Sequence, residues 1–89
     1  MEKTIEKYLV SRVESLGGLC VKFPPLFFAG FPDRIVMLPG GRIVFVETKA
    51  PGETPRAIQR KVHARLCGLG FRVEVLDSKE SINKFIAGL

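Results

Sequence analysis

The chain has 89 residues, 46% of them hydrophobic, so we expect one small domain over residues 1–89 with a modest core. The formal net charge of +5 favours a polyanionic partner such as a nucleic acid. No apolar segment is long enough to span a membrane, and the charged N-terminus is unlike a signal peptide. Two cysteines are too few for a disulfide framework or a zinc site, so we expect reduced thiols and a cytoplasmic location.

The first half of the chain predicts one helix and three strands. Apolar residues at helical spacing predict a helix that ends at Gly17-Gly18, and residues 19–23 predict a short strand. A loop over 24–32 follows, and then two strands, over 33–38 and 42–49, joined by Pro39-Gly40-Gly41. The apolar stripe of the helix consists of Ile5, Leu9, Val13 and Leu16. The loop contains a Pro24-Pro25 step and three aromatic residues, Phe27, Phe28 and Phe31, for which we expect core or dimer contacts.

The second half of the chain predicts a helix, a strand and a final helix. Thr54 as N-cap and Pro55 at the first helical position mark the start of the first of these helices. A strand over 71–76 follows, and Asp77 or Ser78 caps the last helix. The resulting order, αβββαβα, predicts the α/β class: a mixed sheet flanked by helices, with one helical crossover into a parallel strand. The apolar stripe of the first of these helices would consist of Ile58, Val62, Leu66 and Leu69.

The hairpin brings two carboxylates to one end of the sheet. If the loop is Pro39 to Gly41, Leu38 pairs with Arg42 and, counting outward, Asp33 faces Glu47 on one face of the sheet. Strand periodicity places Lys49 on that same face. Like charges opposite each other are unfavourable, and a divalent cation such as Mg²⁺ or Mn²⁺ between the carboxylates would relieve the repulsion.

An ordinary ion pair is the alternative, in which Glu47 pairs with Lys49 or Arg34 at a strand end. The spacing of an aspartate, a glutamate and a lysine around a hairpin favours the metal site over that alternative. Pro32-Asp33 followed by Glu47-Thr48-Lys49 resembles the motif of the PD-(D/E)xK nuclease superfamily. The surrounding text resembles the stand-alone VRR-NUC domains of phages and prophages, in a likeness that covers nearly the whole chain and includes residues 30–36, 38–42, 45–52 and 56–59.

This resemblance implies a PD-(D/E)xK nuclease-like core, metal-dependent endonuclease activity on DNA and, for a phage-encoded chain, action in the host cytoplasm. Asp33 and Glu47 would bind Mg²⁺ or Mn²⁺, the main-chain carbonyl of Thr48 would fill another position, and a glutamate of the first helix would complete the site. Helical projection favours Glu6 for that role, with Glu2 as the alternative. Lys49 would position the attacking water or stabilise the transition state.

The remaining assignments concern substrate binding. Gln59 would orient Lys49 or a phosphate, although its spacing fits a solvated helix position equally well. We predict phosphate contacts by Lys22, Arg34, Arg56 and Arg60, and we give His63 no role as metal ligand or general base.

Stand-alone members of the family resemble Holliday-junction resolvases, which implies a homodimer that acts on branched or four-way DNA without an organic cofactor. A nucleic-acid-binding module that does not cut, and a nuclease subunit that needs a partner protein, are the alternatives.

Overall fold

In the computed structural model the main chain is described for residues 2–24 and 26–89, and side chains are described from Thr4 onward apart from Pro25. The Pro24-Pro25 step and the side chain of Glu2 therefore lie outside the described residues. The order of elements is the predicted one: α1 (Glu2–Ser15), β1 (Leu19–Lys22), β2 (Arg34–Leu38), β3 (Arg42–Thr48), α2 (Ala57–Gly68), β4 (Arg72–Leu76) and α3 (Lys79–Ala87).

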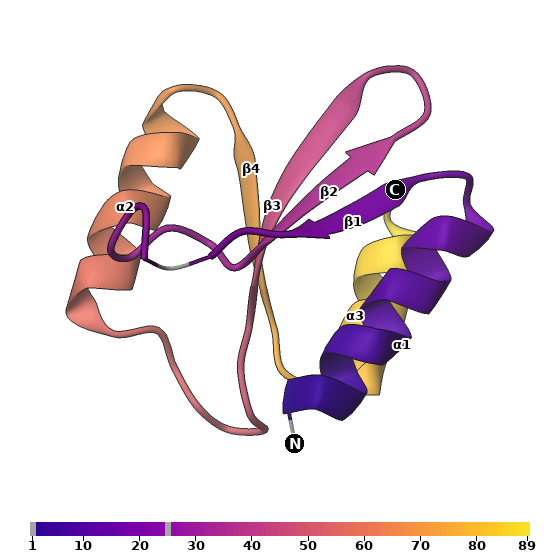
Figure 1. Ribbon diagram of the computed structural model, residues 1–89, viewed down its shortest axis with the longest axis horizontal. Helices are drawn as coiled ribbons and strands as arrows, with labels where there is room; N and C mark the ends of the chain where they lie inside the picture. The colour runs from indigo at the N-terminus through magenta and orange to yellow at the C-terminus, as the bar shows by residue number, and fades with distance from the viewer. Residues whose placement is uncertain (1, 25) are drawn as a thin grey trace.

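The four strands form one mixed sheet in the order β1-β2-β3-β4. β1, β2 and β3 are antiparallel neighbours, whereas β4 runs parallel to β3 after the crossover through α2. Leu38 pairs with Arg42 and Ile35 with Phe45, which confirms the predicted register of the hairpin. Figure 1 shows α1 and α3 side by side at one side of the sheet and α2 at the other.

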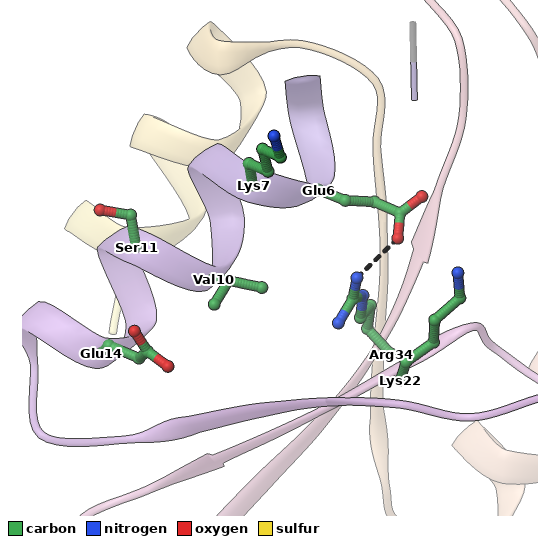
Figure 2. Close-up of a pocket in the computed structure, with 7 residues that line it drawn as sticks. All are labelled: Glu6, Lys7, Val10, Ser11, Glu14, Lys22 and Arg34. Atoms are coloured by element: carbon green, nitrogen blue, oxygen red, sulfur yellow. Dashed lines mark hydrogen bonds and ion pairs between the residues drawn. The ribbon is translucent and has the colours of Figure 1, made fainter. Parts of the chain in front are cut away.

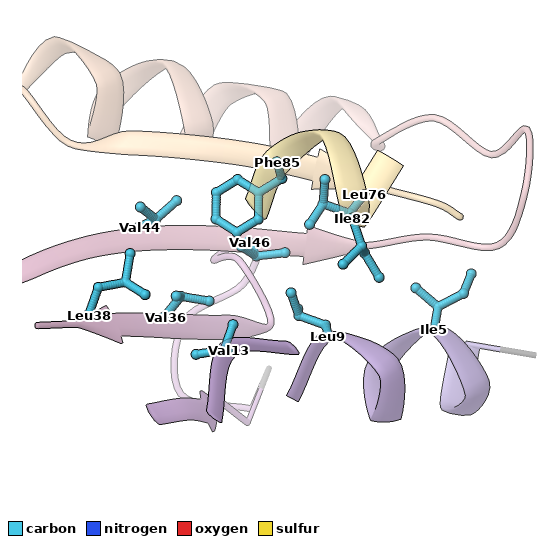
Figure 3. Packing of buried hydrophobic residues seen from close by; sticks show 10 residues of the cluster. All are labelled: Ile5, Leu9, Val13, Val36, Leu38, Val44, Val46, Leu76, Ile82 and Phe85. Carbon is cyan, nitrogen blue, oxygen red and sulfur yellow. The ribbon is translucent and has the colours of Figure 1, made fainter. Parts of the chain in front are cut away.

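The hydrophobic core lies between the sheet and the pair α1 and α3 (Figure 3). Alternate residues of each strand face these helices, because successive side chains of a strand point to opposite faces. Leu9, Val13 and Ile82 are fully buried among them. Leu16, predicted to belong to the stripe of α1, is instead 43% exposed, because the helix ends at Ser15. The strand residues of the core are Val36, Leu38, Val44, Val46 and Leu76.

Helix α2 begins later than predicted. Its first residue is Ala57 and its N-cap is Arg56, so Thr54 and Pro55 precede the helix. The side chain of Gln59 accounts for this start, because its Oε1 accepts a hydrogen bond from the main-chain N–H of Arg56 at 2.8 Å. That contact satisfies one of the N–H groups that the first turn of a helix leaves without a partner.

The buried face of α2 is also rotated from the predicted one. Ile58 and Leu69, which the apolar pattern placed inside, are 47% and 67% exposed. Gln59, His63 and Leu66 are the buried residues of the helix. The reason lies in what α2 covers: this part of the sheet carries the buried carboxylate of Glu47, so polar side chains face it.

The aromatic loop is partly buried. The ring of Phe31 lies 4.7 Å from that of Phe23 and 5.3 Å from that of Phe45, between centroids, so Phe31 extends the packing on the α2 side of the sheet. Phe27 and Phe28 are 77% and 51% exposed. The expectation of a core contact thus holds for Phe31 and not for these two. None of the helices in the described part of the chain is long and apolar enough to cross a membrane.

Candidate active site

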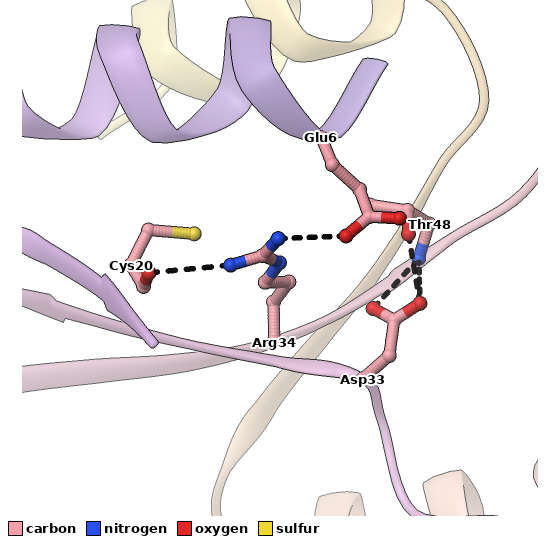
Figure 4. Close-up of polar contacts among 5 residues, drawn as sticks. All are labelled: Glu6, Cys20, Asp33, Arg34 and Thr48. Carbon is pink, nitrogen blue, oxygen red and sulfur yellow. Dashed lines mark hydrogen bonds and ion pairs between the residues drawn. The ribbon is translucent and has the colours of Figure 1, made fainter. Parts of the chain in front are cut away.

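Asp33 lies directly before β2 and joins the start of that strand to the end of β3. Its carboxylate accepts hydrogen bonds from the hydroxyl of Thr48 at 2.7 Å and from the main-chain N–H of Thr48 at 3.1 and 3.3 Å (Figure 4). Burial raises the pKa of Asp33 and nearby Glu6 raises it further, while the bonds from Thr48 and the charge of Arg34 oppose the shift. The carboxylate is therefore held in one orientation.

Glu47 is buried, with 4% of its surface exposed, and no other acid of the site is as deeply buried among the described side chains. Its Oε2 accepts a hydrogen bond from Nε2 of Gln59 at 3.1 Å, whereas its buried Oε1 has no hydrogen-bond partner among the described residues. Burial, and then the charge of Asp33, raise the pKa of Glu47 to about 7, against the opposing effect of Lys49 and Arg56. The charge of Asp33 thus disfavours ionisation of Glu47, in keeping with the nearness of the two acids that the hairpin register predicts.

His63 is a residue of this site that sequence reasoning did not assign. It is buried, and its Nε2 lies 3.5 Å from Oε1 of Glu47. Burial lowers its pKa, and so does the charge of Lys49, which favours the neutral imidazole. Its signal in the sequence was its spacing of four residues from Gln59, because residues four apart lie on one face of a helix.

Lys49 follows β3 and is partly buried. Its main-chain N–H donates to the carbonyl oxygen of Leu76 at 3.0 Å, which fixes this residue beside the end of β4. The charge of Lys49 lowers the pKa of both Glu47 and His63. The structure therefore brings Asp33, Glu47, Lys49 and Gln59 to one edge of the sheet.

Glu6 is turned towards Arg34. The two side chains, 16% and 14% exposed, form an ion pair of 2.6 Å between Oε1 and Nη2 (Figure 4). The sequence suggested a metal ligand and a DNA contact for these residues separately, and did not indicate that they pair. In the described part of the chain, no three histidine, cysteine or acidic side chains are gathered into a ready metal-binding cluster.

The other predicted DNA contacts lie at the surface. Lys22 is exposed at the end of β1, where it pairs with Arg34 in the sheet register. Arg56 and Arg60 are exposed at the start of α2, and Arg56 is near enough to lower the pKa of Glu47. Of these three residues, only Arg56 is thus shown to act on the acids of the site.

No protein-family model matches the chain. It is 53% identical over 79 residues to a protein named "Putative nuclease p44" of Acyrthosiphon pisum secondary endosymbiont phage 1, a match that covers 89% of this chain and 85% of the relative. A solved structure of a VRR_NUC domain, 37% identical, superposes with a TM-score of 0.91 over 97% of this chain and 94% of the other. The chain belongs to the VRR-NUC family.

The residues of this VRR-NUC chain fit a divalent cation. Glu47 Oε1 is buried without a hydrogen-bond partner among the described residues, and burial raises the pKa of both Asp33 and Glu47. Carboxylate and carbonyl oxygens are the ligands that Mg²⁺ and Mn²⁺ prefer. A cation between these two carboxylates would offset the free-energy cost of burying their charges and would reduce their mutual repulsion.

Proposed function

We propose that this VRR-NUC protein is a metal-dependent, structure-specific DNA endonuclease that acts as a homodimer resembling the Holliday-junction resolvases. The observation that carries the proposal is the pair of carboxylates, Asp33 and Glu47, held at one sheet edge beside Lys49. A structural role would favour neutralising such a pair, whereas phosphodiester hydrolysis uses it. The family membership and the nuclease name of the phage relative support the same activity.

In this proposal Asp33, Glu47 and the carbonyl of Thr48 hold Mg²⁺ or Mn²⁺, and Glu6 completes the site after leaving Arg34. When bound, such a cation polarises the phosphoryl oxygen and makes a water molecule more acidic. The protein holds its ligands in place beforehand: Thr48 orients the carboxylate of Asp33 and Gln59 orients that of Glu47. Fixed ligands need less rearrangement in the transition state, which is a source of catalysis.

Lys49 supplies the positive charge next to the reacting phosphate. Its ammonium group stabilises the extra negative charge that develops on phosphorus-bound oxygens, or orients the attacking water. Gln59 acts by keeping Glu47 in position rather than by binding Lys49 directly, since its amide is already bonded to the carboxylate. This refines the role expected from the sequence.

Exposed apolar residues support the dimer. β1 is an edge strand, and its Leu19 and Val21 are 59% and 42% exposed, with Phe27 and Phe28 of the aromatic loop also exposed. Apolar surface of this kind marks a protein–protein contact when it is contiguous. Two sites related by a twofold axis would deliver the two symmetric cuts that a four-way junction requires.

Two alternatives belong to other classes. A binding module that does not cut would keep the fold without needing the acids and the lysine, yet Asp33, Glu47 and Lys49 are all present. A nuclease subunit that requires a partner protein would keep the same site and show no activity alone.

The test is cleavage of a labelled four-way junction beside linear duplex, single strand and a flap, with Mg²⁺, Mn²⁺ or EDTA. We expect paired symmetric nicks in the junction with either metal, and none with EDTA. Lys49→Ala should abolish cutting while junction affinity survives, and Asp33→Asn should abolish the metal-dependent reaction. Lys84→Ala, which changes an exposed lysine of α3, is the matched control and should cut like the wild type.

Three outcomes would count against the proposal. Cutting that persists in Asp33→Asn would refute the paired-carboxylate site. Junction binding by the wild type without cutting under every metal condition would favour the binding module or the partner-dependent subunit. A monomer in analytical ultracentrifugation, both free and with junction DNA, would refute the homodimer.

A further inference from the structure

A pocket of about 470 Å³ lies between α1 and the β1–β2 edge of the sheet (Figure 2). Lys22 and Arg34 line it from the sheet, and they share one face because they are partners in the antiparallel register. Glu6, Lys7 and Glu14 line it from the helix. Figure 4 shows Glu6 and Arg34 near Asp33, so the pocket lies on the Asp33 side of the proposed metal site.

The charge available in this pocket is positive. Glu6 is occupied by its ion pair with Arg34, and Figure 2 shows Glu14 at the other end of the pocket from Lys22. Lys7 and Lys22 form no ion pair with any described side chain. Arg34 has in addition a buried Nε without a hydrogen-bond partner in the described part of the chain. The ammonium groups of Lys7 and Lys22 are thus donors that the folded protein does not use itself, whereas the Nε of Arg34 is buried and its Nη atoms are bonded to Cys20 and Glu6.

A non-bridging phosphate oxygen is the ligand that matches these donors. Lysines bind phosphate as point charges, and the guanidinium of arginine binds it through several N–H groups. Carboxylate ligands would meet the same cations, yet a small acid has no reason to lie beside a phosphodiester-cutting site. The backbone of a bound DNA strand is continuous, so the phosphates next to the scissile one must lie on a surface that neighbours the metal site.

We propose that this pocket binds a backbone phosphate of the DNA strand other than the one being cut, held by Lys7 and Lys22 with Arg34 at its inner wall. The proposal rests on the proposed nuclease function and adds α1 to the DNA-binding surface. Occupation of the pocket also gives Arg34 an anionic partner in place of Glu6. That exchange frees the Glu6 carboxylate, which then faces Asp33 and the metal site.

The first test is the salt dependence of junction binding, measured by fluorescence anisotropy with EDTA present so that nothing is cut. Lys7→Gln, Lys22→Gln and the control Lys84→Gln each remove one exposed positive charge. A lost phosphate contact reduces the slope of log K against log salt concentration by about 0.9. We expect that reduction for Lys7→Gln and for Lys22→Gln, and the wild-type slope for Lys84→Gln. Unchanged far-ultraviolet circular dichroism would show that each variant is folded.

The second test locates the phosphate. Junctions that carry one neutral methylphosphonate at successive positions near the cut should weaken wild-type binding at one position outside the scissile link. The same substitution should have little further effect on Lys22→Gln, because the contact is already lost. An equal loss in wild type and variant at every position would overturn the proposal, as would slopes for Lys7→Gln and Lys22→Gln that match Lys84→Gln.

These outcomes are separable from those of the proposed function. If the wild type cuts the junction and the lysine variants bind like the control, the nuclease assignment stands and the pocket assignment fails. If the wild type never cuts but the two lysines carry the salt slope, the pocket assignment stands and the chain is a binding module or a partner-dependent subunit. If the wild type does not bind DNA, both fail.

Discussion

Ionisation of Glu47 should destabilise the folded protein when no metal is bound. Burial and the neighbouring Asp33 raise the pKa of this carboxyl from its ordinary value of 4.5 to about 7. Well below pH 4.5 it is protonated in the folded and the unfolded chain alike, so no penalty arises. Between pH 4.5 and 7 the unfolded chain binds fewer protons than the folded one, so stability falls as pH rises, and above about pH 7 the whole penalty is present.

The size of this penalty follows from the shift. At about 1.4 kcal/mol for each pKa unit, the difference between 4.5 and about 7 gives an upper limit of about 3 kcal/mol. Glu47→Gln keeps the size of the side chain and an oxygen that accepts the bond from Gln59, but cannot ionise. We therefore expect the variant to be about 1–3 kcal/mol more stable than the wild type at pH 8 in EDTA, and nearly equal to it at pH 4.

Urea unfolding followed by circular dichroism measures the difference. With a slope of roughly 1–1.5 kcal/mol per M, the midpoint should rise by about 1–2 M at pH 8. Both proteins should be compared at one concentration, because dimer formation makes stability depend on concentration. Mg²⁺ should stabilise the wild type by about 2.7 kcal/mol at a hundred times its dissociation constant. It should have little effect on Glu47→Gln, which lacks one of the charged ligands.

The reasoning would be refuted by a Glu47→Gln protein no more stable than the wild type at pH 8 in EDTA. A gain in stability of equal size at pH 4 and pH 8 would also refute it, because a difference independent of pH cannot arise from the carboxylate charge. Glu80→Gln is the matched control, since it removes an exposed carboxylate of α3 by the same exchange and should show no comparable gain at pH 8.

Three further predictions concern single contacts. Leu9→Ala should cost about 2–5 kcal/mol in urea unfolding, because Leu9 is fully buried in the core; a loss below 1 kcal/mol would contradict that packing. Thr48→Val removes the hydroxyl that donates to Asp33 at 2.7 Å, so it should weaken Mg²⁺ binding in calorimetry and destabilise the protein by about 1–3 kcal/mol at pH 8. Unchanged metal affinity would show that this hydrogen bond does not orient Asp33. Gly30→Ala should lower the melting temperature, because Gly30 has a φ of +84° and an added Cβ would lie 2.6 Å from the carbonyl oxygen of Ile58. Gly40→Ala is the control: its φ is also positive, but its added Cβ would meet no neighbour, so it measures the cost of the backbone conformation alone.

Much of the fold was determined by local sequence patterns. The apolar spacing of Leu9 and Val13 marks one face of a helix, and the Pro39-Gly40-Gly41 turn sets the hairpin register, because a strand that slipped by one residue would expose its buried face. The confirmed register ends with Arg34 opposite Val46, one residue short of the two acids, and the charge of Asp33 raises the pKa of Glu47, so the nearness of these acids was predictable from the chain alone. The sequence narrowed the cap of α3 to Asp77 or Ser78, because capping depends on residues adjacent in sequence, and the structure has Ser78 in that position.

Only the tertiary structure decided which side chains meet this pair of acids. The apolar stripe of α2 suggested Ile58 and Leu69 as its buried residues, yet the helix buries Gln59 and His63 against Glu47. The ion pair of Glu6 with Arg34 likewise joins residues 28 positions apart. The spacing of apolar residues shows which face of a helix is most apolar, but the element that packs against the helix decides which face is buried. Where that element carries a buried carboxylate, polar partners are buried with it, because an unpaired charge in the interior costs more free energy than an exposed apolar side chain.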